Sequence, residues 1–179
     1  SRNGVVVVAS AGNDATDRPS YPAAFTPWSN GKGPVEPRKD VVPIVSVGAL
    51  NPNRTDALFT NGGPWVRSYA PGASVVSTMP PFVGGLQPVA RTVVDKRIRE
   101  SIDPDDYRGA VGRRQRGGFG LWSGTSFAAP TVAGAIAAVL SQDLAKPGMG
   151  ARSKDSARSA VTRGWKAVEA LTDMKRPRH

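Results

Sequence analysis

Ser126 is the residue of this sequence best placed to act as a nucleophile. It stands in the segment SGTSFAAPTVAG, residues 123–134, where small neighbours surround one hydroxyl at the start of an apolar helix. The unpaired N–H groups of a first helical turn, and the positive end of the helix dipole, stabilise negative charge that develops beside them. Pro130 agrees with a position near the helix start. The alternative is an ordinary serine or threonine N-cap of a buried helix.

A second polar residue, Asn13, ends a segment of buried-strand character. The segment VVVVASAGN, residues 5–13, contains four successive valines, which are typical of a strand buried on both faces of a parallel sheet. Gly12, Asn13 and Asp14 predict a turn at the carboxyl end of that strand. Ligand sites in open α/β sheets gather at such ends. The segment alone leaves Asn13 with two interpretations, a plain turn residue or part of a binding site.

Both segments resemble motifs of the subtilisin-like serine proteases. The segment GTSFAAPTVAG, residues 124–134, resembles the serine motif of that family, and the AGN of residues 11–13 resembles the end of its oxyanion strand. Further segments of familiar type follow in the expected order: residues 21–25, 42–50 and 66–78. Together the matches cover roughly residues 4–82 and 120–145. Their order along the chain makes the resemblance specific.

The resemblance implies a serine endopeptidase that cleaves polypeptides through an acyl-enzyme on Ser126. It implies that Asn13 and the Ser126 N–H stabilise the oxyanion. It also implies a set of substrate-binding residues: Ser10, Ala11, Gly12, Gly124 and Thr125. Secretion to the outside of the cell is a further expectation from the family. Calcium is common in the family, but no residues of this sequence can be assigned to a metal site, and no other cofactor is indicated.

The residues that would activate Ser126 are not recognisable in this sequence. A serine hydroxyl needs a general base, and the base needs a carboxylate to orient it. In subtilisin-like enzymes the chain order is Asp, His, Ser, whereas the only histidine here is His179, the last residue, in a basic run. Three aspartates near the matched segments are interpreted as loop carboxylates: Asp14, Asp17 and Asp56. We therefore expect the catalytic Asp and His in a segment upstream of Ser1, and we expect this chain alone to be inactive.

The elements that would position these residues follow from the hydrophobic pattern. Strands are predicted at about 5–10, 42–49, 65–69 and 74–78, and helices at about 125–142 and 155–171, with a short helix near Val93–Ser101. This order predicts an α/β fold. The family resemblance implies a subtilisin-like three-layer α/β/α arrangement with a mostly parallel sheet, present here as a partial domain. In the second helix an apolar stripe predicts packing against the sheet or the first helix: Ala157, Val161, Trp165, Val168 and Leu171.

The domain organisation predicted from these segments has two parts. Residues 1–145 are interpreted as the C-terminal part of a catalytic domain, with insertions at about 27–40 and 84–120. Residues 146–179 are interpreted as a basic tail that contains the packing helix. The 84–120 insertion is a polar surface loop or, alternatively, a lid that borders the cleft.

The composition of the 179 residues limits the partners. The formal net charge of +10 is concentrated in residues 84–120 and 146–179, outside the matched core. Such charge can attract nucleic acid. However, the basic stretches contain neither interleaved aromatic residues for stacking nor a known binding module, so we expect no nucleic-acid partner. No run of about twenty apolar residues is present, so no membrane span is expected. The absence of cysteine excludes disulfides and zinc–thiolate sites.

Two other classes of function remain open. A non-catalytic pseudoprotease would bind peptides in the same cleft, and its upstream sequence would lack the family's His and Asp motifs. A basic interaction module would bind an acidic surface in a salt-dependent manner and would be indifferent to Ser126→Ala.

Overall fold

The structure is a computed structural model that describes residues 1–79, 82–83, 91–94, 97–100, 114–115, 118–144 and 157–175. The chain divides into two compact units. The first contains Ser1–Ala73 and Gly124–His179, and the second contains Ser74–Ser123. Each unit is described by itself.

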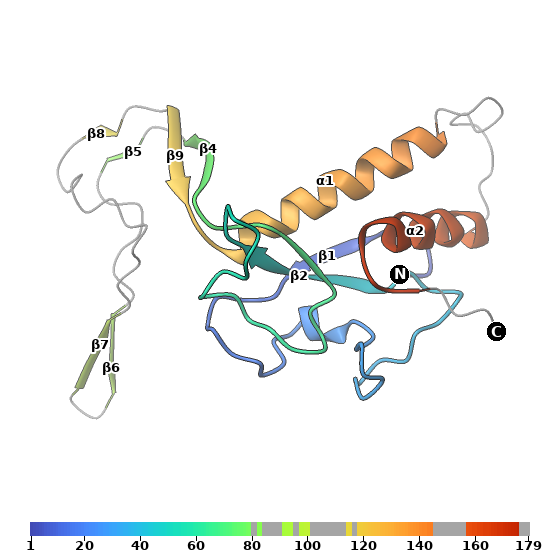
Figure 1. Ribbon diagram of the computed structural model, residues 1–179, viewed down its shortest axis with the longest axis horizontal. Coiled ribbons are helices and arrows are strands. Elements are labelled where there is room, and N and C mark those ends of the chain that lie inside the picture. The colour runs from blue at the N-terminus through green and yellow to red at the C-terminus, as the bar shows by residue number, and fades with distance from the viewer. Residues whose placement is uncertain are drawn as a thin grey trace. The chain divides into compact units, whose positions relative to one another are not determined.

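A parallel three-stranded sheet organises the first unit (Figure 1). Its strands are β1 (Val7–Ser10), β2 (Ile44–Leu50) and β3 (Ser68–Pro71), hydrogen-bonded in the order β1-β2-β3. Val8 lies opposite Val45, and Val47 lies opposite Ser68. Parallel strands place their carboxyl ends at one edge of the sheet. The predicted α/β fold with parallel pairing is therefore confirmed, although the strands begin and end at slightly different residues than predicted.

Two helices cover one face of this sheet. They are α1 (Thr125–Leu144) and α2 (Ala157–Leu171), and Figure 1 shows both on the same side of β1 and β2. Side chains of a strand alternate between faces, so every second residue of β2 points toward the helices. The main core consists of these residues and the buried faces of the helices: Val45, Val47, Ala49, Ala128, Val132, Ile136, Val161, Trp165 and Val168. Three residues of the apolar stripe predicted for the second helix, Val161, Trp165 and Val168, are buried in this core.

The opposite face of the sheet is covered by loops and by the 3-10 turn η1 (Ala23–Phe25), drawn in blue in Figure 1. A smaller apolar cluster lies there: Ala11, Ala23, Ala24, Trp65 and Val66. The buried Ser46 hydroxyl, which points to this side, donates to the Trp65 carbonyl and accepts a hydrogen bond from the Arg67 N–H at 3.0 Å. These bonds satisfy a polar side chain that β2 carries into the interior.

α2 and the segment that follows it are held by residues of the loops around the sheet. Arg67, whose side chain is only 8% exposed, contacts Asp173 through Nε and Oδ1 at 2.9 Å. The Trp165 indole N–H donates to the Arg38 carbonyl at 3.2 Å, and the Thr26 hydroxyl contacts the Met174 sulfur at 3.4 Å. The described part of the predicted basic tail thus packs on the first unit, while the boundary at residue 146 stays a prediction.

The second unit consists of short antiparallel pairs. β4 (Val75–Met79) pairs with β9 (Gly118–Trp122), β5 (Phe82–Val83) with β8 (Arg114–Gln115), and β6 (Arg91–Val94) with β7 (Arg97–Glu100). The strand predicted at 74–78 is present as β4. The short helix predicted near Val93–Ser101 is wrong, because Val93 and Ile98 face each other across the β6–β7 pair. β-Branched side chains favour this extended backbone. Most of the predicted 84–120 insertion lies outside the described residues.

α1 also has the length and hydropathy of a membrane-crossing helix. Its window Thr125–Gln142 has a mean hydropathy of 1.2, and 28% of that window is buried. The sequence predicts no membrane span, and length and composition alone are weak grounds for one. α1 packs against β1, β2, β3 and α2, as a core helix does.

Gly48 of β2 is a position where a larger side chain should destabilise the fold. A Cβ there would lie 2.5 Å from Tyr69 Cε1 and 3.2 Å from Thr60 Oγ1. We expect Gly48→Ala to lower the free energy of unfolding by about 1–3 kcal/mol, because overpacking forces neighbours to shift. Urea unfolding followed by circular dichroism measures this. Gly62→Ala is the control, since a Cβ at Gly62 meets nothing within 4 Å; equal losses in both variants would contradict the packing argument.

Candidate active site

Ser126 is presented at the amino-terminal end of α1. It is the second residue of that helix and is exposed, whereas the preceding Thr125 is 1% exposed. The turn before the helix is held by the Gly124 N–H, which donates to the Gly72 carbonyl at 2.7 Å. The N–H groups of the first helical turn have no acceptor within the helix, and the Ser126 N–H is one of them. A hydroxyl and a free donor therefore occur together on Ser126.

Asn13 is tied to this helix end through Thr125. Its Oδ1 accepts hydrogen bonds from the Thr125 N–H at 2.8 Å and from the Thr125 hydroxyl at 3.0 Å. A backbone N–H can only donate, so the atom facing it must be the amide oxygen, and this fixes the orientation of the amide. The Asn13 Nδ2 is thereby left as a donor on an exposed residue, and the partner of the amide oxygen, Thr125, directly precedes Ser126. The site thus holds two donors and one hydroxyl.

Gly12 lets the turn at the end of β1 approach α1. Its φ of +108° lies in the region that favours glycine, and its N–H donates to the Thr125 hydroxyl at 3.1 Å. A Cβ at Gly12 would lie 2.4 Å from the Asn61 Nδ2. The predicted turn after the strand is therefore confirmed, and it is packed closely on both sides.

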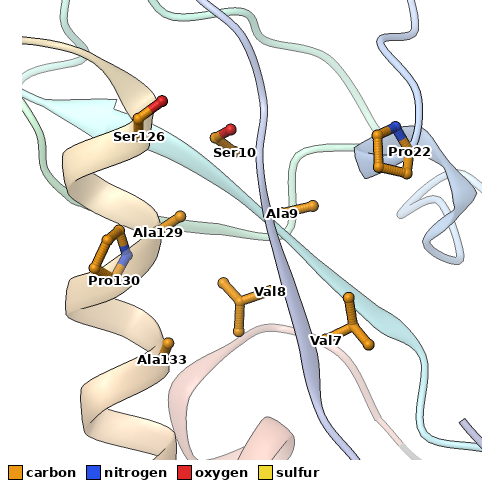
Figure 2. Close-up of a pocket in the computed structure, with 9 residues that line it drawn as sticks. All are labelled: Val7, Val8, Ala9, Ser10, Pro22, Ser126, Ala129, Pro130 and Ala133. Atoms are coloured by element: carbon orange, nitrogen blue, oxygen red, sulfur yellow. The ribbon is translucent and has the colours of Figure 1, made fainter.

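A groove of about 540 Å³ lies beside Ser126. α1 and β1 form its walls, with Pro22 beyond β1 (Figure 2). Its lining is small and apolar apart from two serines: Val7, Val8, Ala9, Ser10, Pro22, Ser126, Ala129, Pro130 and Ala133. Figure 2 shows Ser126 and Ser10 toward one end of the groove and Val7 and Ala133 toward the other. Such a groove can hold an apolar side chain next to a reacting group.

The predicted substrate-binding residues differ in their burial and in what they contact. Ser10 lines the groove with Ser126. Ala11 is fully buried and Thr125 nearly so, and the backbones of Gly12 and Gly124 belong to the hydrogen-bonded turns around Asn13. Substrate binding by these residues stays a prediction, and for Ala11 and Thr125 only their backbone could take part.

Two residues near the site were missed by sequence reasoning. Pro22 lines the groove, and Asn61 contacts the turn that carries Asn13. Asn61 stands between Thr60 and two glycines, and nothing local to it indicates a partner some fifty residues earlier in the chain. His179 lies outside the described residues. Within the described ranges no group of three or more His, Cys, Asp or Glu could hold a metal ion.

Comparisons with known proteins agree with this arrangement. The sequence model of the subtilase family matches residues 1–165. Subtilisin E of Bacillus subtilis (strain 168) is 28% identical over 144 residues, which cover 78% of this chain and 24% of subtilisin E. This chain therefore spans about a quarter of the length of that relative.

Two solved structures are also similar. The prenylagaramide maturation protease PagA is 22% identical with a TM-score of 0.45, over 79% of this chain and 34% of that one. A protease from Pseudoalteromonas arctica PAMC 21717 is 24% identical with a TM-score of 0.45, over 78% of this chain and 31% of that one.

The site combines an exposed serine at a helix start with an anchored amide at the end of a parallel strand, the nucleophile and oxyanion-donor types that a serine-hydrolase site requires. The family match is more specific: the chain belongs to the subtilase family, a family of serine proteases. The recognition made from the serine and AGN motifs is confirmed.

Proposed function

We propose that the full-length protein, meaning this chain together with an upstream segment, is a serine endopeptidase. The observation that carries the proposal is the joint placement of Ser126 and Asn13. Thr125 holds the Asn13 amide by two hydrogen bonds and is followed directly by Ser126 at the start of α1. Two donors beside one exposed hydroxyl suit an acyl transfer, in which negative charge develops on a carbonyl oxygen.

In the proposed reaction the Ser126 Oγ attacks the carbonyl carbon of the scissile peptide bond, and its proton passes to a histidine. The Asn13 Nδ2 and the Ser126 N–H donate to the carbonyl oxygen as it becomes negatively charged. The histidine returns the proton to the leaving nitrogen, the C–N bond breaks, and an ester remains on Ser126. Water, deprotonated by the same histidine, then hydrolyses the ester and regenerates the hydroxyl.

The substrate is proposed to be a polypeptide whose side chain enters the groove beside Ser126. The groove has a volume of about 540 Å³ because its walls carry small residues, among them Ala9, Ala129 and Ala133. An apolar lining favours an apolar side chain, because its burial removes apolar surface from water. Ser10 would contribute the polar group of the β1 wall.

The histidine and its aspartate are proposed to lie in the upstream segment. The sequence contains one histidine, His179, which follows Ser126 instead of preceding it. Within the described residues β1 is hydrogen-bonded to a strand on one side only, and Val7 on it is 44% exposed. An upstream segment would have the open strand edge of β1 to pair with. Secretion and the need for calcium remain proposals from family membership.

The absence of a recognisable general base from this chain favours one second candidate, a pseudoprotease that binds peptides in the groove without cleaving them. Peptide hydrolysis separates the two. The full-length protein and the 179-residue chain are incubated with a library of peptide anilides, and release of the aniline is followed. We expect release by the full-length protein and none by the 179-residue chain. No release by a folded, peptide-binding full-length protein would favour the pseudoprotease, and release by the short chain would contradict the need for an upstream base.

A further inference from the structure

A buried asparagine, Asn61, lies against the turn that carries Asn13. Asn61 follows β2 in the loop that leads to β3, and it is 1% exposed. Its Nδ2 donates to the Ala11 carbonyl at 3.0 Å, and its Oδ1 accepts a hydrogen bond from the Asp14 N–H at 2.8 Å. The Asn61 N–H donates to the Gly12 carbonyl at 2.9 Å. Two longer contacts of 3.4 Å reach the Thr16 N–H and the Asp14 carboxylate.

These bonds reach the chain on both sides of Asn13. Ala11 and Gly12 precede Asn13, and Asp14 follows it, while the Asn13 side chain itself is left to Thr125. The Ala11 carbonyl can only accept and the Asp14 N–H can only donate, so both ends of the Asn61 amide are assigned. The two shortest hydrogen bonds of the Asn61 side chain are therefore made to backbone groups of Ala11 and Asp14, on either side of Asn13.

We propose that Asn61 is a positioning residue for the oxyanion site. This inference rests on the proposed function. Stabilisation of an oxyanion requires donors that are already in place before the charge develops. Gly12 is the most flexible residue type in the turn, and Asn13 and Asp14 are exposed, so the turn needs a fixed support. Thr125 holds the amide of Asn13 from the helix side, and Asn61 holds its backbone from the loop after β2.

The test uses kinetics of the full-length protein on a peptide substrate. Asn61→Ser shortens the side chain, and Asn61→Asp keeps its volume and its acceptor but loses the donor to the Ala11 carbonyl. We expect either variant to lower kcat by roughly 10- to 100-fold, the scale that small misplacement of a catalytic group costs, with KM changed less than about twofold. Asn51→Ser is the matched control, because the Asn51 amide donates to the Thr55 hydroxyl and the Asp56 carbonyl of its own loop. It should leave kcat unchanged.

A double-mutant cycle distinguishes positioning from general stability. If Asn61 acts through Asn13, Asn61→Ser should cost little further kcat in the Asn13→Ala background. An equal further loss in that background, a rise in KM with kcat unchanged, or unfolding of both Asn61 variants would overturn the proposal. The proposed function fails separately, through full activity of Ser126→Ala, whatever the Asn61 variants do.

Discussion

Ser126→Ala in the full-length protein should lower kcat by about six orders of magnitude, the loss known for removal of the nucleophile in subtilisin. The methyl group leaves no oxygen to attack the carbonyl, so no acyl-enzyme forms. Substrate binding should persist, because Ser126 is only one of the nine residues that line the groove. Peptide anilide hydrolysis gives kcat, and equilibrium binding of a peptide to the variant shows whether the groove is intact.

Ser141→Ala is the control for this result. Ser141 lies on the same helix and is exposed, and its hydroxyl donates to the Ala137 carbonyl at 2.8 Å. It should keep full activity. Comparable activity of Ser126→Ala and the unmodified protein would remove Ser126 from the chemistry.

Asn13→Ala should lower kcat by about 10²–10³ while KM changes little, a range taken from the oxyanion-hole asparagine of subtilisin. In the proposed mechanism the Asn13 Nδ2 donates to the carbonyl oxygen as negative charge develops on it, so loss of this donor should affect the transition state rather than the bound substrate. Asn13→Asp is the sharper variant, since it keeps the size and the acceptor oxygen but replaces the donor with a negatively charged oxygen. Steady-state kinetics on one peptide substrate measures both variants.

Asn30→Ala provides a matched loop asparagine for comparison. Asn30 is exposed, and its Oδ1 accepts a hydrogen bond from the Lys32 N–H at 3.0 Å, away from the groove. Its kinetics should match those of the unmodified protein. If Asn13→Ala raised KM and left kcat unchanged, Asn13 would be a substrate contact and the oxyanion role would be wrong.

The parts of the fold that the sequence predicted well are those with strong local patterns. Successive valines in β1, the apolar run of β2 and the small-residue stretch of α1 each indicate one kind of element. The β6–β7 pair was missed because short polar segments fit a helix or a hairpin about equally well. The pairing of β4 with β9 was also not predictable, since the register depends on residues more than thirty positions apart.

In the candidate site, too, the residues in local motifs were predictable and the contacts between distant residues were not. Ser126 and Asn13 stand in recognisable motifs, so their nearness in space could be expected from the family resemblance. The way Thr125 connects them became visible only in the structure, through its bonds to Asn13 and Gly12. Asn61 and Pro22 reach the site from distant loops, and the types of these residues give no sign of it. Contacts between residues far apart in the chain cannot be predicted from local patterns in one sequence.

Covalent labelling shows whether Ser126 is an activated nucleophile. The full-length protein is treated with a peptidyl phosphonate, which reacts with activated serines, and the modified residue is located by mass spectrometry. We expect one phosphonyl group on Ser126, and none in Ser126→Ala or in the denatured protein. Labelling of another serine, or unchanged labelling in Ser126→Ala, would contradict this expectation.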